Sequence, residues 1–264
     1  MLKQFAVIGS PIEHSLSPFI HQRFAAQFGL ELSYEKKLGE QAHFEVQVQD
    51  FFAKGGMGLN ITLPFKERAF ALATYRTPRC KRAAAANTLW SKGGEIYADN
   101  TDGIGLIHDL ANYLSLLQKR VLILGAGGAA RGIIGPLLDE KPAELILVNR
   151  TLDKAKKLGN EFPGINVCSF SELEGSFDLL INATSASISH QQLLLSPSLL
   201  SPQSFCYDLA YHREKPTPFV SWAREHSIKA VDGLGMLVEQ AAEAFFIWHQ
   251  LRPETNPVKV ELCL

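Results

Sequence analysis

The chain carries almost no net charge, few cysteines and no long apolar run. Its 26 Lys and Arg residues oppose 27 Asp and Glu residues, which gives a formal net charge of −1. A chain this close to neutrality has no long-range field that would collect nucleic acid or an anionic membrane. We therefore expect neither as a partner, although a local basic pocket for a single phosphate is compatible with this balance.

The few cysteines are far apart and form no C-x-x-C pair; they are Cys80, Cys168, Cys206 and Cys263. Such spacing is typical of free thiols in a reducing compartment and offers neither a disulfide framework nor a zinc site. The apolar run near the N-terminus, Phe5–Gly9, is too short for the core of a signal peptide. No uncharged apolar run approaches the roughly 20 residues that span a bilayer. We expect a cytoplasmic protein without a bound metal.

What the chain does contain is a regular alternation of short apolar runs with helical stretches, within 264 residues of 46% apolar content. Strands are predicted at Phe5–Gly9, Ser33–Leu38, Met57–Thr62, Arg120–Leu124, Leu145–Asn149, Ile165–Ser169, Leu179–Asn182, Ser204–Leu209 and Lys229–Val231. Helices are predicted at Pro18–Phe28, Ala42–Ala53, Phe65–Ala73, Gly105–Leu117, Ala129–Asp139, Leu152–Glu161, Pro218–Glu225 and Leu234–Leu251. This pattern predicts an α/β fold with mostly parallel sheets covered by helices on both faces.

The alternation begins twice, at residue 4 and again at residue 120, which indicates two α/β domains. A connecting helix is expected within Gly103–Leu117, and the glycine-rich turn D-G-L-G from Asp232 precedes the last long helix. We expect the chain to cross back to the first domain there. The predicted domains are residues 1–103 together with 236–264, and residues 104–235.

A glycine-rich loop follows the strand at Arg120, in the stretch R-V-L-I-L-G-A-G-G-A-A-R-G-I. Gly125, Gly127 and Ala130 fit the G-x-G-x-x-G/A pattern of dinucleotide-binding domains. The first glycine permits a tight turn, the second lets the backbone approach a pyrophosphate, and the small third residue lets the helix pack closely. The alternative is a glycine-rich turn with no ligand. The flanking strand and helix favour a dinucleotide at the helix N-terminus.

The next strand ends in Asn149, Arg150 and Thr151, with Lys154 one helical turn later. Enzymes that use NAD usually carry Asp or Glu here to bind the ribose 2′-hydroxyl, and that carboxylate would repel a 2′-phosphate. A cation with polar neighbours therefore favours NADP. The alternative interpretation is a solvated helix start with Thr151 as its N-cap.

Four polar segments of the first domain lie at the ends of predicted elements, where active sites of parallel sheets form. They are Ser15–Pro18, Asn60–Lys66, Asn87–Thr88 and Asp99–Gly103. Each alone is explained by an ordinary turn or helix cap, since Ser17 precedes a proline and Asp102 precedes a glycine. Together, in one small domain, they indicate a binding site.

With these motifs in order the chain resembles shikimate dehydrogenase over nearly its full length. The segments that carry the resemblance are G-S-P-I-E-H-S-L-S-P from Gly9, G-L-N-I-T-L-P-F-K-E from Gly58, A-A-N-T-L from Ala85, N-T-D-G from Asn100, G-A-G-G-A-A from Gly125, N-R-T from Asn149, I-N-A-T-S from Ile181 and D-G-L-G-M-L-V-E-Q-A-A from Asp232. Any one of them could arise by chance, whereas the ordered set is highly specific.

The resemblance implies a Rossmann-type NADP domain after a substrate domain, and reversible NADPH-dependent reduction of 3-dehydroshikimate to shikimate in aromatic amino-acid biosynthesis. It implies that Lys66 is the acid/base and Asp102 its partner. The implied substrate-binding residues are Ser15 and Ser17 for the carboxylate, Asn60, Thr62, Asn87 and Gln240 for the ring, and Tyr211 from the second domain. The implied cofactor-binding residues are Gly125, Ala126, Gly127, Gly128, Ala129, Asn149, Arg150, Thr151, Lys154, Thr184, Gly233 and Met236.

The chain departs from the family pattern at Ser187, where glycine is usual, and at Arg213, where many relatives have proline. The alternatives are a quinate/shikimate dehydrogenase that prefers NAD, a non-catalytic relative that binds shikimate or nucleotide, and a methylene-tetrahydrofolate dehydrogenase. Arg150 and Ser17 argue against the first. Lys66 and Asp102 argue against the second, and the serine pair against the third. The sequence is compatible with a monomer or a homodimer.

Overall fold

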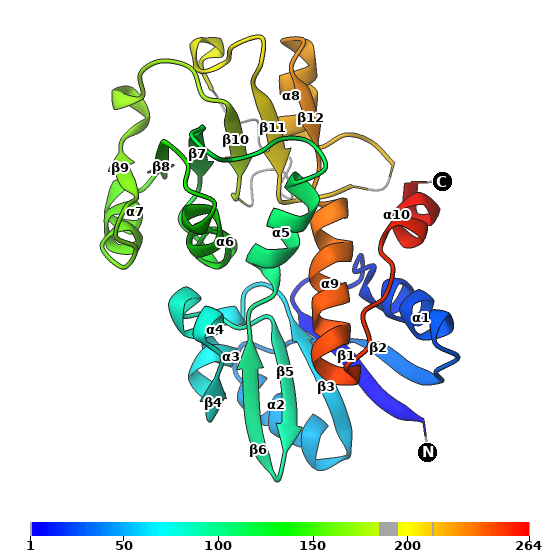
Figure 1. The fold of residues 1–264 in the computed structure, drawn as a ribbon. Coiled ribbons are helices and arrows are strands. Elements are labelled where there is room, and N and C mark those ends of the chain that lie inside the picture. The colour runs from blue at the N-terminus through cyan, green and yellow to red at the C-terminus, as the bar shows by residue number, and fades with distance from the viewer. Residues whose placement is uncertain (1, 185–194, 213, 264) are drawn as a thin grey trace. The chain divides into compact units, whose positions relative to one another are not determined.

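The computed structural model describes residues 2–184, 195–212 and 214–263, and the chain divides into two compact units. The first unit comprises Met1–Leu106 and Leu237–Leu264, and the second comprises Ile107–Met236. Both divisions fall inside helices, α5 (Asp102–Leu110) and α9 (Leu234–His249) (Figure 1). The sequence had suggested divisions at residues 103 and 235, at the starts of these helices.

The first unit contains a six-stranded sheet in the order β2-β1-β3-β5-β6-β4. Its strands are β1 (Lys3–Gly9), β2 (Leu32–Leu38), β3 (Gly56–Ile61), β4 (Tyr75–Arg76), β5 (Thr88–Lys92) and β6 (Glu95–Asp99). The pairs among β1, β2 and β3 are parallel, but β5 runs antiparallel to both β3 and β6. This sheet is therefore more mixed than expected. The reason is a tight hairpin at Gly93 and Gly94, whose φ angles of 63° and 82° suit a two-residue turn.

Helices cover both faces of this sheet: α1 (Ser17–Gln27), α2 (Phe44–Ala53), α3 (Lys66–Leu72), α4 (Pro78–Ala83), α9 and α10 (Asn256–Cys263). On one face, Phe44 of α2 and Phe65 before α3 stack at 4.5 Å and pack against Ile8 and Ile61. The opposite face carries Phe5, which lies 5.0 Å from the Trp248 ring of α9. Because both faces are covered, the polar ends of the strands are the parts of the sheet left to form a site.

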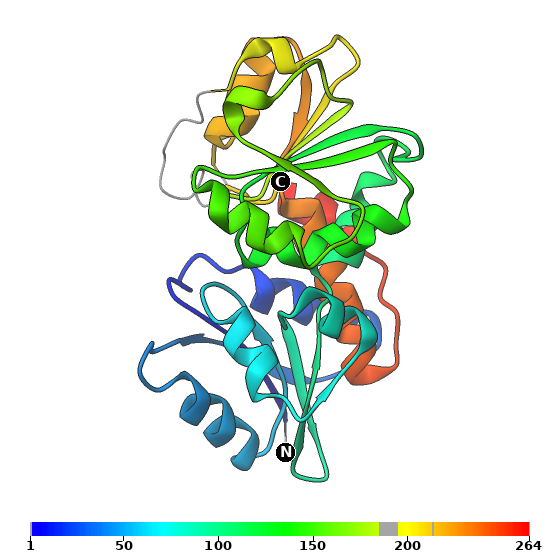
Figure 2. The ribbon, with the colours of Figure 1, turned by 90° about the vertical axis from the view of Figure 1, so that its left-hand side faces the viewer.

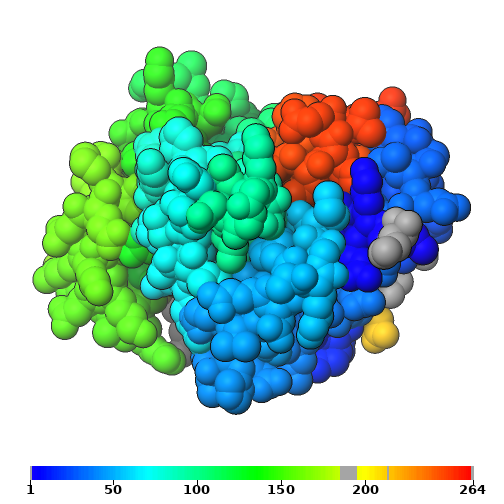
Figure 3. Space-filling model, turned by 90° about the horizontal axis from the view of Figure 1, so that it is seen from below, coloured from blue at the N-terminus to red at the C-terminus, as the bar shows by residue number. Residues whose placement is uncertain are grey.

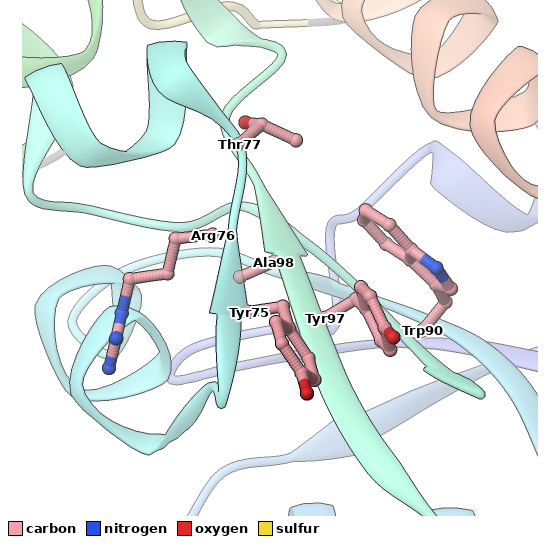
Figure 4. Close-up of a pocket in the computed structure, with 6 residues that line it drawn as sticks. All are labelled: Tyr75, Arg76, Thr77, Trp90, Tyr97 and Ala98. Carbon is pink, nitrogen blue, oxygen red and sulfur yellow. The ribbon is translucent and has the colours of Figure 1, made fainter. Parts of the chain in front are cut away.

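A row of aromatic rings crosses the sheet next to α9. A Cβ on Gly58 would come within 2.4 Å of the Trp248 ring, so only glycine lets this helix approach β3. Gly58 pairs with Trp90, Trp90 with Tyr97, and Tyr97 with Tyr75. The last three rings line a shallow hollow of about 200 Å³ (Figure 4). Seen from below, the orange end of α9 reaches the surface between blue β1 and the green hairpin (Figure 3).

The second unit contains a six-stranded, wholly parallel sheet in the order β12-β11-β10-β7-β8-β9. The strands are β7 (Arg120–Leu124), β8 (Glu144–Val148), β9 (Asn166–Cys168), β10 (Leu179–Asn182), β11 (Phe205–Asp208) and β12 (Lys229–Val231). The strand order reverses between β7 and β10, as in doubly wound nucleotide-binding sheets, and ligands bind at that point. The predicted parallel sheet with this architecture is confirmed here.

Helices α6 (Gly128–Asp139), α7 (Leu152–Gly159) and α8 (Pro218–Glu225) connect these strands, with α6 and α8 on opposite faces (Figure 2). Two short 3₁₀ turns, Phe170–Glu172 and Pro197–Leu199, lie in the loops. Four successive residues of β7, Val121–Leu124, have no exposed surface, so both faces of the sheet are covered. Such double burial explains why β7 is continuously apolar rather than alternating.

Among the described residues, none of the helices has the length and apolarity needed to cross a bilayer. In the same part of the chain we find no cluster of three or more His, Cys, Asp or Glu side chains suited to a metal ion. Cys80, Cys168 and Cys206 are free thiols, and burial raises the pKa of Cys80 and of Cys206 to about 12. At neutral pH these two thiols are therefore protonated and behave as small apolar side chains.

Candidate active site

Lys66 and Asp102 form a largely buried ion pair in the first unit. Lys66 begins α3 and Asp102 begins α5, and their Nζ and Oδ2 atoms are 2.6 Å apart. The side chains are 16% and 7% exposed. Asp102 lies in the first turn of α5, where the helix dipole favours an acidic residue. The ion pair thus joins the starts of two helices.

Asn87 binds the other oxygen of the same carboxylate. Its Nδ2 donates to Asp102 Oδ1 at 2.9 Å and to Thr101 Oγ1 at 2.9 Å. The amide cannot be reversed, because Oδ1 accepts from the backbone N–H of Thr101 at 2.8 Å and an N–H group only donates. Asp102 is thus fixed by Lys66 on one oxygen and by Asn87 on the other.

Two further predicted residues join this cluster. Gln240 of α9 accepts from Asn87 Nδ2 at 3.2 Å, while its own Nε2 donates to Leu237 O at 2.8 Å. Asn60, in β3, donates to Asn87 O at 3.1 Å. Thr62 follows β3 and is half-buried, with its methyl group packed on Gly9. The structure therefore brings five of the predicted residues into one connected polar group: Lys66, Asp102, Asn87, Gln240 and Asn60.

A partly buried ion network supports the loops that carry this group. Arg79 of α4 donates twice to Asp99, at 2.8 Å each, and once to Glu243 of α9 at 2.9 Å. Burial acts to lower the pKa of Arg79, but Asp99 and Glu243 outweigh it and the pKa is raised. The backbone carbonyl of Asp99 in turn accepts from Asn87 N at 3.1 Å. Arg79 and Glu243 were not predicted from the sequence, because a charged residue in a helix usually lies on the surface.

Ser15 and Ser17 lie together at the start of α1. Ser15 Oγ donates to Ser17 Oγ at 3.2 Å and accepts from Ser17 N at 3.3 Å. Ser17 is buried and Ser15 half-buried. Two neighbouring hydroxyls are suited to donate to one carboxylate, because each can rotate its proton toward the ligand.

The three glycines of the loop in the second unit differ in whether they leave room for a side chain. Gly125 has a φ of +105°, and a Cβ there would lie 2.9 Å from Thr184 Cγ2. Gly127 and Gly128 have no other atom within 4 Å of a Cβ position, and Gly128 begins α6. Gly125 is thus required by the fold itself, whereas the next two glycines leave the helix N-terminus open to a ligand. Such a cradle fits a pyrophosphate.

At the end of the neighbouring strand β8, Arg150, Thr151 and Lys154 are exposed. Neither cation forms an ion pair with any residue that the structure describes. Asn149 Nδ2 donates to Thr151 O at 2.9 Å, which holds the turn that presents Arg150. Thr151 is the N-cap of α7, but its side chain makes no capping hydrogen bond. Arg150 and Lys154 can therefore bind an anionic ligand without first breaking an ion pair with a described residue.

Other predicted cofactor residues surround the ends of β10 and β11. The Thr184 N–H and hydroxyl both donate to Asn182 Oδ1, at 3.1 and 2.7 Å. Asn182 Nδ2 donates to Asp208 Oδ1 at 3.0 Å, and both residues are fully buried. A Cβ on Gly233 would lie 2.3 Å from Leu209 O, so this close approach requires glycine.

The remaining predicted residues of the second unit are Met236 and Tyr211. The N–H of Met236 donates to Tyr207 OH at 3.2 Å, and Tyr207 donates to Asp109 at 2.7 Å. Burial, aided by Asp109, raises the pKa of Tyr207 well above its usual value. Tyr211 is half-buried. Ser187 and Arg213, the two departures from the family pattern, lie outside the described residues.

Three family models match the chain in succession. The model described as shikimate dehydrogenase substrate binding domain matches residues 7–89. The model for shikimate / quinate 5-dehydrogenase matches residues 108–213, and that for the shikimate 5′-dehydrogenase C-terminal domain matches residues 233–259. These matches cover the glycine-rich loop, α9 and the members of the polar cluster other than Asp102, which lies between the first two matched ranges.

Individual proteins match over nearly the whole chain. The shikimate dehydrogenase (NADP(+)) of Legionella pneumophila (strain Lens) is 60% identical over 99% of both chains. The crystal structure of an Ael1 enzyme from Pseudomonas putida has a TM-score of 0.91 at 44% identity, covering 99% of this chain and 98% of that one. The shikimate 5-dehydrogenase of Thermus thermophilus, solved with NADP(H) and shikimate, has a TM-score of 0.89 at 32% identity, with the same coverage.

Proposed function

Because the chain belongs to the shikimate dehydrogenase family, we propose that it catalyses the reversible NADP-dependent interconversion of shikimate and 3-dehydroshikimate. The observation that carries the proposal is the buried Lys66–Asp102 pair, held on its second oxygen by Asn87. This group combines a proton donor with fixed hydrogen-bond partners, as reduction of a ring ketone requires. The proposed role is a step of aromatic amino-acid biosynthesis.

Lys66 is assigned the proton. In the reducing direction its ammonium donates a proton to the substrate oxygen while its positive charge stabilises the negative charge that develops there. In the oxidising direction the neutral amine accepts the hydroxyl proton. Asp102, 2.6 Å away, orients the amine and compensates its charge. Asn87 keeps the carboxylate in place, so no reorganisation is needed when the proton moves.

The rest of the polar group is assigned to the substrate. Ser15 and Ser17 donate to its carboxylate, and the amides of Asn60, Asn87 and Gln240 bind ring hydroxyls. We also assign Thr62 and Tyr211 to substrate binding. A polyhydroxylated acid matches this mixture of hydroxyl and amide groups, because each ring hydroxyl can both donate and accept.

The second unit is assigned to NADP, which supplies or accepts the hydride when bound. The open glycines Gly127 and Gly128, with Gly125, Ala126 and Ala129, are suited to the pyrophosphate. Arg150 and Lys154, which have no ion pair with a described residue, are suited to the 2′-phosphate, together with Asn149 and Thr151. Thr184, Gly233 and Met236 are assigned to the nicotinamide half of the cofactor. The free cysteines favour a cytoplasmic location.

An absorbance assay at the nicotinamide band tests the proposal directly. Shikimate and quinate are each supplied with NADP and with NAD, and size-exclusion chromatography of the same sample separates a monomer from a homodimer. We expect turnover with shikimate and NADP to exceed the other three combinations. Equal or faster turnover of quinate with NAD would instead support the quinate/shikimate alternative. Binding of shikimate without turnover would support the non-catalytic one.

A further inference from the structure

Tyr34 places a buried phenol beside the polar cluster, although it belongs to none of the polar motifs. It lies in β2, paired with Phe5 of β1, and is only 5% exposed. Its hydroxyl is 2.6 Å from Asn60 Oδ1. This is a short, buried hydrogen bond to a side chain that the proposed function assigns to the substrate.

The surroundings of Asn60 decide which way its amide faces. Its Nδ2 is 3.1 Å from the backbone carbonyl of Asn87, and a carbonyl oxygen can only accept. The same nitrogen is 3.2 Å from Thr88 Oγ1. The amide oxygen must therefore face Tyr34, and the phenol must be the donor. Without that donor, the oxygen of a buried amide would lose its partner, which favours rearrangement of the side chain.

The phenol keeps its proton at neutral pH. Burial raises the pKa of Tyr34 well above its usual value. The hydrogen bond to Asn60 therefore has one direction, with the phenol as donor and the amide oxygen as acceptor. Because Tyr34 stays neutral, its one proton is committed to Asn60.

The ring itself is held by stacking. His21 of α1 lies parallel to it, with 4.4 Å between ring centroids and 13° between planes. Trp248 of α9 lies 6.5 Å away on a tilted plane. Contacts from α1 and α9 therefore restrict the position of the hydroxyl, since Tyr34 has only two side-chain torsions.

We propose that Tyr34 is a positioning residue for the substrate: its phenol holds the amide of Asn60 in the orientation in which this side chain meets the ring hydroxyls. It does so from behind the site, through other side chains, and is not itself a catalytic residue. The inference rests on the proposed function, because it is this function that assigns Asn60 to the substrate.

The test is Tyr34→Phe, which retains the stacked ring and removes only the hydroxyl. We expect KM for shikimate to rise about tenfold, as for one hydrogen bond lost, with kcat and KM for NADP changed less than about twofold. Tyr97→Phe is the matched control, because Tyr97 lies in the same sheet but in the aromatic row of Figure 4. Its shikimate KM should equal that of the wild type.

A double-mutant cycle separates positioning from loss of packing. If Tyr34 acts through Asn60, then Tyr34→Phe should raise KM less than about twofold in an Asn60→Ala background. A full tenfold rise in that background, or an unchanged KM in the single variant, overturns the proposal. If Tyr34→Phe does not fold, the same kinetics are measured with 3-fluorotyrosine at position 34, which keeps the ring and the hydroxyl but changes the donor strength of the hydroxyl. An unchanged KM for shikimate would then overturn the proposal.

Failure of the proposed function gives a different result. In that case the wild type neither binds shikimate in calorimetry nor reduces NADP with it. If wild-type activity is present and the Tyr34 variants behave as the wild type, only the positioning role fails.

Discussion

The Nζ of Lys66 lies 2.6 Å from Asp102 Oδ2, in a pair whose members begin two different helices of the first unit. Replacing Lys66 by Ala should therefore remove both the proton donor and the positive charge. We expect kcat to fall by roughly 10²–10⁴-fold while shikimate binding, measured by calorimetry, is largely retained. The assignment of Lys66 as the proton donor is wrong if turnover drops less than about tenfold while KM for shikimate rises sharply. Lys81→Ala, on α4, is the control for loss of a lysine.

Ser15→Ala and Ser17→Ala should raise KM for shikimate more than they lower kcat. The substrate carboxylate is remote from the bond that breaks, so its hydrogen bonds are similar in the ground and transition states. Each lost bond to a charged group is worth about 1.5–3 kcal/mol. Steady-state kinetics with shikimate decide the matter, and a loss confined to kcat would remove these serines from the carboxylate site.

Arg150→Asp should shift cofactor preference from NADP toward NAD. The guanidinium has no ion pair with a described residue, and a carboxylate in its place would repel a 2′-phosphate. We expect weaker NADP binding with kcat nearly unchanged at saturation, and Arg150→Gln should give a smaller shift because it only removes the attraction. High salt should weaken NADP binding in the wild type and less so in the Asp variant. An unchanged ratio of kcat/KM for NADP over NAD makes Lys154 the next candidate.

Gly125→Ala should lower the stability of the protein, whereas Gly127→Ala should lower its affinity for NADP. At Gly125 the φ of +105° and the contact with Thr184 strain any side chain, so we expect a loss of about 1–3 kcal/mol in unfolding free energy. At Gly127 the φ is −100° and the space is empty, so stability should change by less than about 1 kcal/mol. NADP affinity should nevertheless fall, because the methyl group occupies the cradle. Urea unfolding and cofactor titration of both variants measure the contrast.

Stability should decline in mild acid because of His21. Burial, aided by His249, lowers its pKa from 6.5 to about 3, and its Nε2 has no hydrogen-bond partner among the described residues. The unfolded chain therefore binds the proton first, so the native state is fully favoured above pH 6.5 and loses stability as the pH falls toward 3. By about pH 5 this costs about 2 kcal/mol.

The variant His21→Phe keeps an aromatic ring against Tyr34 and removes the titration. Its unfolding free energy should fall by about 2 kcal/mol less than that of the wild type between about pH 7.5 and pH 5. His43→Gln, at an exposed histidine, should follow the wild type. If His21→Phe shows the wild-type slope, the acid sensitivity arises elsewhere.

The elements that the sequence predicted well are those with continuous burial and clear ends. Arg120–Leu124, Leu179–Asn182 and Pro218–Glu225 have the bounds that were predicted. The hairpin at residues 88–99 was missed, because its half-buried strands mix polar and apolar residues around the Gly93–Gly94 turn. The helix predicted to continue to Leu117 ends at Leu110, where the side chain of Asn112 binds the backbone carbonyls of His108 and Asp109.

The residues of the candidate site, too, could be predicted from the sequence only in part. Lys66, Asn87 and Asp102 could be proposed because their motifs are polar and lie at element ends. Tyr34 and Arg79 could not, since each looks like an ordinary strand or helix residue. Their contacts with Asn60 and Asp99 depend on which strands and helices become neighbours. That information is held by the topology and not by local sequence.

The division of the chain within α9 has a consequence for biosynthesis. The first unit includes Leu237–Leu264, so most of α9, with the buried Glu243, leaves the ribosome after the whole of the second unit. The second unit, Ile107–Met236, is complete before this segment begins. Domains generally fold in the order in which they are synthesised, N-terminal first. For this chain we expect the reverse order, because the unit that begins later is the first whose residues are all synthesised. The N-terminal strands, with Phe5 and Gly58, can be covered by α9 only after Trp248 has left the ribosome.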